Sequence, residues 1–296
     1  MNNFTDTVVE NRDWSGADLR NADFTRARLR GCRLDGADLA DAVFDEAQIE
    51  NCTFLGARLP AASFSRTTFR DVRLDGAVLE RAYLLECVLE NVLWPGATLS
   101  RATLRHLSGL PPLENAAAEM LHCIECDLSA LRFKRVAAIL LTLQGCSCRG
   151  IEAEDCDLTQ LIAMHTDFGG ARFTRCRLDR AGLMGGDLSG SILRDCSLTQ
   201  AHLAGAILRA AQWEGVNARQ AVLTDADLEG ARMPGINLHM ADLSHVRARN
   251  ADLRNADLRV ADLHDARLDG CALNGARMDG ARPTDPERLR AEHFAV

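Results

Sequence analysis

The sequence has few aromatic residues, a single lysine and no long apolar run, and each shortage excludes a class of protein. Aromatic residues make up 5% of the 296 positions although 47% are hydrophobic, so small and medium aliphatic side chains must fill the interior. No stretch of about 18 apolar residues exists, which excludes a membrane-spanning helix. Residues 1–10 carry acids and no basic segment before an apolar run, so no secretory signal is visible and we expect a cytoplasmic protein.

Basic residues are not concentrated in any part of the chain. The net charge is −8, from 42 acids and 34 bases, and Lys134 is the single lysine. The arginines are dispersed, which argues against direct nucleic-acid binding because that needs a basic stripe. The acidic excess is also mild and dispersed, so a surface with the charge of a DNA duplex would require one face to concentrate it.

A five-residue period dominates the sequence. A large apolar residue occurs at every fifth position from Trp14 to Leu104, and a small residue usually stands two positions before it. The pattern resumes from Leu128 to Met278 and is clearest in residues 251–263, which read ADLRNADLRVADL. A period of five fits neither a helix nor a plain strand.

A second period of twenty residues indicates the geometry. Glycines recur at this spacing, at Gly16, Gly36, Gly56, Gly76 and Gly96. Four pentapeptides per coil with a turn at one corner would produce this spacing, because glycine suits turn positions with positive φ. The A(D/N)LXX pattern resembles the pentapeptide-repeat family over roughly residues 12–282. This resemblance implies an all-β fold, a right-handed quadrilateral β-helix or solenoid, in which the small and the large apolar residues both point inward.

We divide the chain into five parts. Residues 1–11 are expected to form an N-terminal cap, 12–104 a first run of repeats, 105–122 an inserted loop, 123–282 a second run, and 283–296 a C-terminal cap or short helix. The loop is predicted because its Pro-Pro pair cannot sit in a strand ladder, and its alanine-rich part, from Glu114 to Leu121, is suited to a short helix. The alternative is that this segment simply lies along the coil.

Both ends of the repeat are expected to be protected. Phe4, Val8 and Val9 would plug the first coil and shield its open edge. Asp285 and Pro286 suit the N-cap and the first position of a short C-terminal helix. In the family that the sequence resembles, such a helix often closes the last coil and supports a dimer, which implies a homodimer through the C-terminal end.

Outward charges alternate in sign along positions that would stack. Two such ladders have members twenty residues apart: Arg26, Glu46, Arg66 and Glu86, then Arg135, Asp155, Arg175 and Asp195. Opposite charges on neighbouring coils attract each other, whereas a slip by one coil would place like charges together. We interpret the ladders as register control rather than as a binding surface.

Outward positions near the break in the repeat become apolar. They are Val78, Tyr83, Val88 and Leu93. One interpretation is that apolar loop residues cover them, namely Leu107, Leu110, Leu113 and Met120; the other is a partner or dimer interface. The interaction candidates from this region are Val78, Tyr83, Val88, Leu93, Leu110 and Leu113.

The eleven cysteines do not indicate a metal site. Cys123-x-x-Cys126 and Cys146-x-Cys148 resemble ligand spacing, but nine of the eleven occupy the small inward position, where a thiol in a reducing cytosol acts as a small hydrophobe. The eight histidines are dispersed, and no nucleophile–base set, phosphate loop or paired-carboxylate cluster is present. We predict no catalytic residue, no metal and no cofactor, and hence no enzyme.

Two functions therefore remain. The first is a non-enzymatic protein-interaction module or scaffold with an unidentified protein client. The second follows from the resemblance, since quinolone-resistance-type members of the family resemble a DNA duplex and engage DNA gyrase, a type II topoisomerase. Such a mimic needs acids on one face, and Asp252, Asp257 and Asp262 are the candidates, although arginines lie close to them in the sequence. The fold alone decides neither function.

Overall fold

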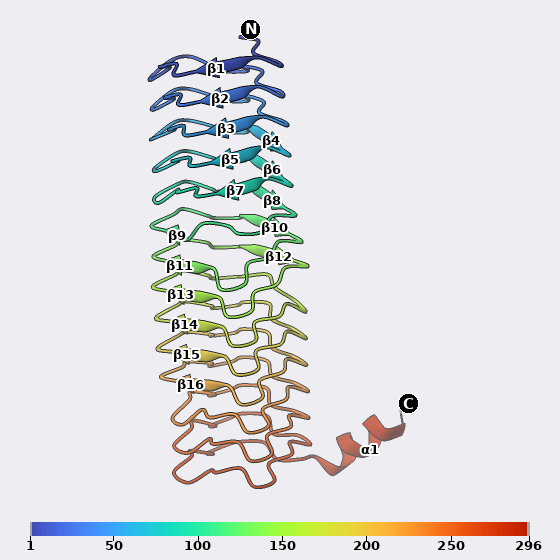
Figure 1. The fold of residues 1–296 in the computed structure, drawn as a ribbon. Helices are drawn as coiled ribbons and strands as arrows, with labels where there is room; N and C mark the ends of the chain where they lie inside the picture. Colours follow the sequence, from blue (N-terminus) through green and yellow to red (C-terminus); the bar gives the residue numbers. More distant parts are fainter. Residues whose placement is uncertain (1, 295–296) are drawn as a thin grey trace. The chain divides into compact units, whose positions relative to one another are not determined.

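Each of two parts of the chain is a four-sided solenoid in the computed structural model, which describes residues 2–294 (Figure 1). The N-terminal unit is Met1–Ser147 and the C-terminal unit is Cys148–Val296. Both have the right-handed quadrilateral β-helix architecture that the family resemblance implied. None of the helices within residues 2–294 has the length and apolar character needed to cross a membrane.

In the N-terminal unit, short parallel strands stack into two sheets and one further pair. The sheets have the orders β1–β2–β3–β5–β7 and β4–β6–β8–β10–β12, and β9 pairs with β11. The strand bounds are β1 Val8–Glu10, β2 Arg28–Arg30, β3 Gln48–Glu50, β4 Ser63–Ser65, β5 Thr68–Arg70, β6 Tyr83–Leu85, β7 Val88–Glu90, β8 Thr103–Arg105, β9 Leu113–Glu114, β10 His122–Ile124, β11 Arg132–Lys134 and β12 Thr142–Gln144.

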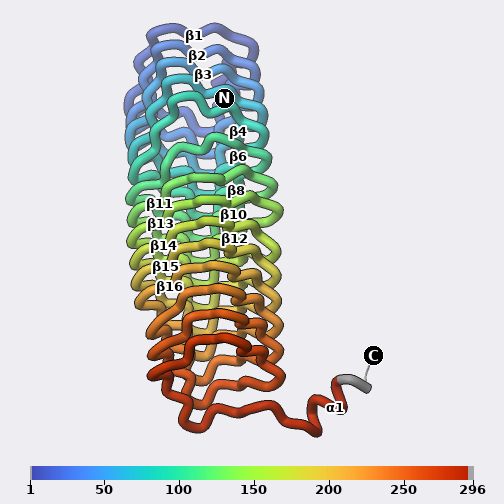
Figure 2. Tube along the Cα trace, turned by 60° about the horizontal axis from the view of Figure 1, so that its bottom comes forward, coloured from blue at the N-terminus to red at the C-terminus, as the bar shows by residue number. Residues whose placement is uncertain are grey.

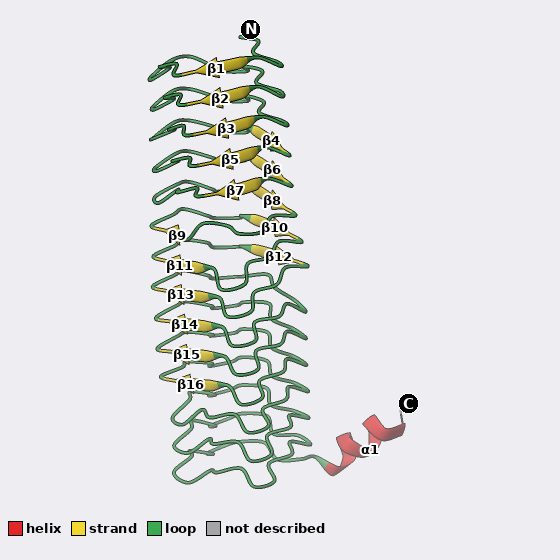
Figure 3. Cartoon of the chain, in the orientation of Figure 1, coloured by secondary structure: helices red, strands yellow, loops and turns green. Residues whose placement is uncertain are grey.

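In the C-terminal unit, four parallel strands stack on one side. They are β13 Glu152–Glu154, β14 Arg172–Thr174, β15 Ile192–Arg194 and β16 Gln212–Glu214. Later coils are joined by isolated bridges, such as Asp242 with Asp262, and most of each coil is turn or loop (Figure 3). Stacked residues are twenty apart, as Phe173 and Leu193 show, so the period of twenty is the length of one coil.

Two side chains of each pentapeptide fill the interior. In the N-terminal unit, Phe24 stacks on Phe44 with ring centroids 4.7 Å apart, and Phe44 stacks on Phe64 at 5.1 Å. In the C-terminal unit, leucine and alanine dominate, and two interior voids have volumes of about 10 Å³ each, roughly the space of one water molecule. Few aromatic residues are therefore needed to fill the interior, because each coil packs directly on the next.

The corners of the coils require positive φ angles. Gly36, in the recurring glycine column, has φ of 64°, as the sequence predicted. Other corners reach the same region without glycine, for example Asn21 with φ of 56° and Asp195 with φ of 51°. Asn and Asp tolerate this conformation better than most residues, so the glycine column marks one corner of several that share a backbone shape.

The solenoid begins earlier than the sequence predicted. Residues 2–11 were expected to cap the first coil, but they form part of it: β1 pairs with β2, and the Phe4 ring stacks on Phe24 at 4.7 Å. Val8 is an exposed outward residue, whereas Phe4 and Val9 are half-buried. The expectation failed because the earliest repeats lack the small residue that identifies later ones.

The segment 105–122 is not an expelled loop. Leu107, Leu110 and Leu113 are buried in the interior, and the indole N–H of Trp94 donates to the Pro111 carbonyl at 3.3 Å. Residues 114–121 form no helix, contrary to the expectation, because they supply the end of β9 and a bridge. The segment therefore lies along the coil, which was the alternative interpretation.

The break in the repeat is a coil that is one residue short. Thr98 bridges Ala117 and Thr103 pairs with His122, so both offsets are 19 residues. After the break, Leu113 pairs with Phe133, twenty positions later. The stretch between Leu104 and Leu113 accommodates the missing residue, which explains why the sequence frame shifts while stacking continues.

Helix α1, Pro286–Phe294, begins where the sequence predicted. The amides of Glu287 and Arg288 donate to Asp285 Oδ1 at 2.8 Å and 3.3 Å, which is the geometry of an N-cap. The helix does not close the last coil, contrary to what the resemblance implied. Leu273 is only half-buried and Met278 is exposed, and Figure 2 shows α1 leading away to the side of the last coil.

Candidate functional site

The outward apolar residues predicted from the sequence do not form one patch. Val88 and Leu93 are exposed, and Val78 and Tyr83 are half-buried. Residues five apart occupy successive sides of a coil, as the different stacking partners of the four residues show. Val78, Tyr83, Val88 and Leu93 therefore lie on four different sides of the N-terminal unit.

The apolar residues of the segment 105–122 do not cover these four outward residues either. Leu110 and Leu113, which were interaction candidates, are buried inside the solenoid together with Leu107. Met120 is exposed. A side chain that points into the coil can neither shield an outward residue nor contact a partner, so Leu110 and Leu113 serve the core.

Three exposed apolar residues lie in two adjacent coils of the C-terminal unit instead. Ile162, Met164 and Met184 are 40%, 47% and 38% exposed. Ile162 forms a bridge with Gly182 in the next coil, and the His165 amide donates to the Met184 carbonyl at 2.9 Å. These contacts place Met164 and Met184 side by side in adjacent coils. We call Ile162, Met164 and Met184 the methionine patch.

Two glycines lie next to the residues of the methionine patch. Gly182 lies opposite Ile162, and Gly185 follows Met184. The His165 ring lies over Gly185 so closely that a Cβ atom there would overlap it. The twenty-residue spacing of the two methionines at outward positions is the sequence signal that could have predicted this patch.

The acids proposed for a duplex-like surface are paired with arginines. Asp252 accepts from Arg254 Nη2 at 2.7 Å. Asp257 accepts from Arg259 Nη2 at 2.7 Å and from Arg277 Nη2 at 2.8 Å. The hydrogen bond from the Arg259 guanidinium holds the pKa of Asp257 down at about 2. Both carboxylates therefore stay ionised, but their charges are locally compensated.

The third acid of that set is compensated in the same way. Asp262 Oδ2 lies 3.1 Å from Arg282 Nη2 and 3.4 Å from Arg288 Nη1, which belongs to α1. Asp252, Asp257 and Asp262 thus form part of a mixed-charge surface. The sequence placed these acids close to arginines, and the structure shows that the two kinds of side chain are in contact.

Each unit contains an ion pair from the predicted charge ladders, and Arg26 of the first ladder pairs with Asp6 instead. Arg66 Nη2 lies 2.6 Å from Glu46 Oε1 in the N-terminal unit, and Arg175 Nε lies 2.7 Å from Asp155 Oδ1 in the C-terminal unit. Each pair joins residues twenty positions apart. Exposed pairs of this kind contribute about 0–1 kcal/mol, which suits register control better than overall stability.

The cysteines occupy the interior, as the sequence predicted. Ten are buried and Cys271 is half-buried. The Cys87 thiol donates to the Phe64 carbonyl at 2.6 Å, and burial raises its pKa to about 12. A thiol with so high a pKa holds its proton and is a poor nucleophile.

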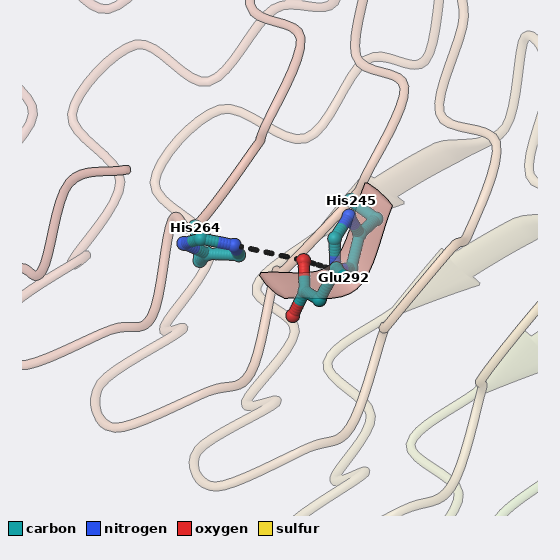
Figure 4. A group of neighbouring side chains, drawn as sticks. All are labelled: His245, His264 and Glu292. Atoms are coloured by element: carbon teal, nitrogen blue, oxygen red, sulfur yellow. Dashed lines mark hydrogen bonds and ion pairs between the residues drawn. The ribbon is translucent and has the colours of Figure 1, made fainter. Parts of the chain in front are cut away.

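One cluster of titratable side chains escaped the sequence analysis (Figure 4). His264 Nε2 lies 3.0 Å from Glu292 Oε2, and His245 Nε2 lies 3.4 Å from the same oxygen. His264 is only 2% exposed. Because residues twenty apart stack, position 264 lies beside position 245, so the repeat could have predicted the two histidines as neighbours. Glu292 belongs to α1, outside the repeat, and no period fixes its place.

A groove of about 270 Å³ also opens on one side of the C-terminal unit. Its walls are Ile192, Arg194, Gln212, Trp213, Glu214, Arg232 and Pro234. The groove combines apolar and charged side chains without a hydroxyl or thiol nucleophile beside a base. It therefore resembles an ordinary gap between outward side chains.

Solved structures of three kinds are similar to this chain. HetL, a pentapeptide repeat protein involved in heterocyst differentiation regulation in the cyanobacterium Nostoc, is 24% identical, with 84% of this chain and 86% of that chain covered and a TM-score of 0.24. A pentapeptide repeat protein of the Arabidopsis thaliana thylakoid lumen is 28% identical over 36% of this chain and 74% of that chain, with a TM-score of 0.28.

The third structure is QnrB1, a plasmid-mediated fluoroquinolone resistance protein. It is 14% identical over 66% of this chain and 97% of that chain, with a TM-score of 0.28. No curated protein sequence matches the chain.

Family models match the repeat directly. The model described as pentapeptide repeats (8 copies) matches residues 3–41, 165–195, 181–212, 201–239 and 241–280. A second model, pentapeptide repeats (9 copies), matches residues 24–68. The first model alone covers more than half of the chain. The chain belongs to the pentapeptide-repeat family.

Proposed function

We propose that this protein is a non-enzymatic interaction module whose docking surface for a protein client is the methionine patch. The observation that carries the proposal is the exposure of Ile162, Met164 and Met184 in two adjacent coils of the C-terminal unit. Contiguous exposed apolar side chains mark interaction sites more often than isolated ones. Methionine is unbranched and polarisable, so it adapts to the shape of a partner.

The packing of the interior supports a role without catalysis. The voids inside the C-terminal unit hold about one water molecule each, which leaves no internal room for a substrate. The repeated aspartates are engaged in the repeat itself, as the contact of Asp257 with Arg259 shows. What remains for function is the outer surface.

The proposal is tested by comparing protein capture by three forms of the full chain. The forms are the wild type, Met164→Glu/Met184→Glu, and Met240→Glu as a matched control, since Met240 is an exposed methionine outside the patch. We expect a client that binds the wild type and the control saturably and is lost from the double variant. Circular dichroism establishes that all three are folded. A client retained by the double variant contradicts the docking site, and the absence of any saturable client contradicts the function.

A DNA-mimicking regulator or inhibitor-protection factor of DNA gyrase is the weaker alternative. A duplex mimic needs uncompensated acids on one face, whereas Asp252, Asp257 and Asp262 all contact arginines. We expect no effect on gyrase supercoiling or on quinolone-stabilised cleavage with protein at tens of micromolar, roughly the weak end of specific binding. Inhibition or protection that weakens with added salt would favour the alternative instead.

A further inference from the structure

We propose that His245, His264 and Glu292 form a binding site for a divalent transition-metal cation such as Zn²⁺, which ties α1 to the last coils of the C-terminal unit. The three ligand atoms, one from each residue, all lie within 4.8 Å of one another. Two come from neighbouring coils and the third from α1, as Figure 4 shows. Two imidazoles and one carboxylate are a donor set that suits zinc and its neighbours in the first transition row.

The distances suit a tetrahedral ion. Bonds of about 2.0–2.2 Å from zinc to nitrogen or oxygen place the ligand atoms of a tetrahedral site roughly 3.3 Å apart. Glu292 Oε2 lies 3.0 Å from His264 Nε2 and 3.4 Å from His245 Nε2. Two edges of the coordination triangle are therefore already close to the required length. A water molecule would complete the coordination.

Neighbouring groups orient two of the ligands. His245 Nδ1 lies 3.2 Å from Asp265 Oδ2, so a proton on Nδ1 donates to this carboxylate and leaves Nε2 free to bind the ion. The Nε of Arg288 donates to Glu292 Oε1 at 2.8 Å and so fixes the carboxylate with Oε2 toward the histidines. A carboxylate behind a metal-binding histidine raises its basicity and holds its ring in place.

His264 makes binding of the ion sensitive to the start of α1. The Asp285 amide donates to His264 Nδ1 at 3.1 Å, so without the ion the ring proton is on Nε2 and donates to Glu292. For Nε2 to bind the ion, this proton must shift to Nδ1, which then no longer accepts from Asp285. Metal binding therefore breaks the hydrogen bond from the amide of Asp285, the N-cap residue of α1.

The direct test is titration of the full chain with Co²⁺ alone, followed by its visible absorption, and with Zn²⁺ alone by calorimetry. We expect one ion per chain and the visible bands of tetrahedral cobalt without the near-ultraviolet band of thiolate ligation. Glu292→Gln and His245→Ala should each weaken binding by more than tenfold. Asp265→Asn, which removes the group behind His245, should weaken it about 10- to 100-fold.

Matched controls separate the site from other histidines and acids. His202 is exposed on the same unit and Glu287 lies on α1, so His202→Ala and Glu287→Gln should bind the ion as tightly as the wild type. Hydrogen exchange of the Asp285 amide should become faster when the ion is bound. The proposal is overturned if the wild type binds neither ion at 100-fold molar excess, if Glu292→Gln and His245→Ala bind as the wild type does, or if thiolate bands appear.

Discussion

Asp257 Oδ2 lies 2.7 Å from Arg259 Nη2 in its own coil and 2.8 Å from Arg277 Nη2 in the next coil. The Asp257 side chain is only 8% exposed. The aspartate that recurs in the A(D/N)LXX repeat thus joins the arginines of two consecutive coils. The negative charge of Asp257 is thereby compensated by two arginines.

The pairing of Asp257 predicts how stability depends on pH. The hydrogen bond from Arg259 lowers the pKa of Asp257 from 3.8 to about 2, so the folded chain binds a proton at this group less readily than the unfolded chain. The stabilisation is fully present above pH 3.8 and is lost as the pH falls through about 2. We expect the urea midpoint of Asp257→Asn to fall less between pH 4 and pH 2 than that of the wild type.

The control for this measurement is Asp269→Asn, because Asp269 is exposed and makes no ion pair within residues 2–294. It should retain the pH dependence of the wild type. If Asp257→Asn loses as much stability on acidification as the wild type does, the pairing of Asp257 contributes nothing to folding.

The buried position of Leu113 predicts the outcome of a pair of alanine substitutions in the segment 105–122. Leu113 is buried and pairs in register with Phe133, whereas Met120 is exposed. Leu113→Ala should destabilise the N-terminal unit by about 2–5 kcal/mol through lost burial and a cavity. Met120→Ala should change stability by less than about 0.5 kcal/mol. Equal effects in chemical denaturation would show that the segment is not part of the core.

A charge placed inside the C-terminal unit should be severely destabilising. Leu178 is buried among other leucines, so Leu178→Asp buries a carboxylate without a partner at a cost of several kcal/mol. Because each coil contacts only its neighbours, unfolding should begin near the substitution and spread. The control is Ala210→Asp at an exposed corner of the same unit with φ of 53°, which should leave the melting temperature nearly unchanged. An unaltered melting temperature for Leu178→Asp would contradict the inward orientation.

The rate at which each cysteine reacts with a thiol reagent should depend on how deeply its side chain is buried. Ten cysteines are buried and Cys271 is half-buried, with its pKa raised mainly by burial. We expect Cys271 to react first with a thiol reagent under native conditions, slowly because little thiolate is present, and the others only on unfolding. Cys271→Ser should remove the first reacting thiol. Rapid native labelling of several thiols in that variant would show that the cysteine columns open to solvent.

The sequence predicted the parts of this fold that depend on the repeat. Phe44 and Leu178 are buried where the five-residue frame places them, because the frame determines which side chains point inward. The segment around Leu110 was predicted wrongly, since the coil there is one residue short and the frame gives no orientation for its leucines. The contact between His264 and Glu292 could not be predicted from the sequence, because it depends on the direction in which α1 leaves the last coil.

The coil that is one residue short shows how much variation in length the stacking tolerates. The loss is confined to the stretch between Leu104 and Leu113, and coils in the N-terminal unit after it resume the offset of twenty. A coil of this fold therefore accommodates one residue fewer without losing the parallel pairing of its strands. Repeat family models match residues 24–68 and next residues 165–195, so the short coil lies in a stretch of the chain that these sequence models leave unmatched.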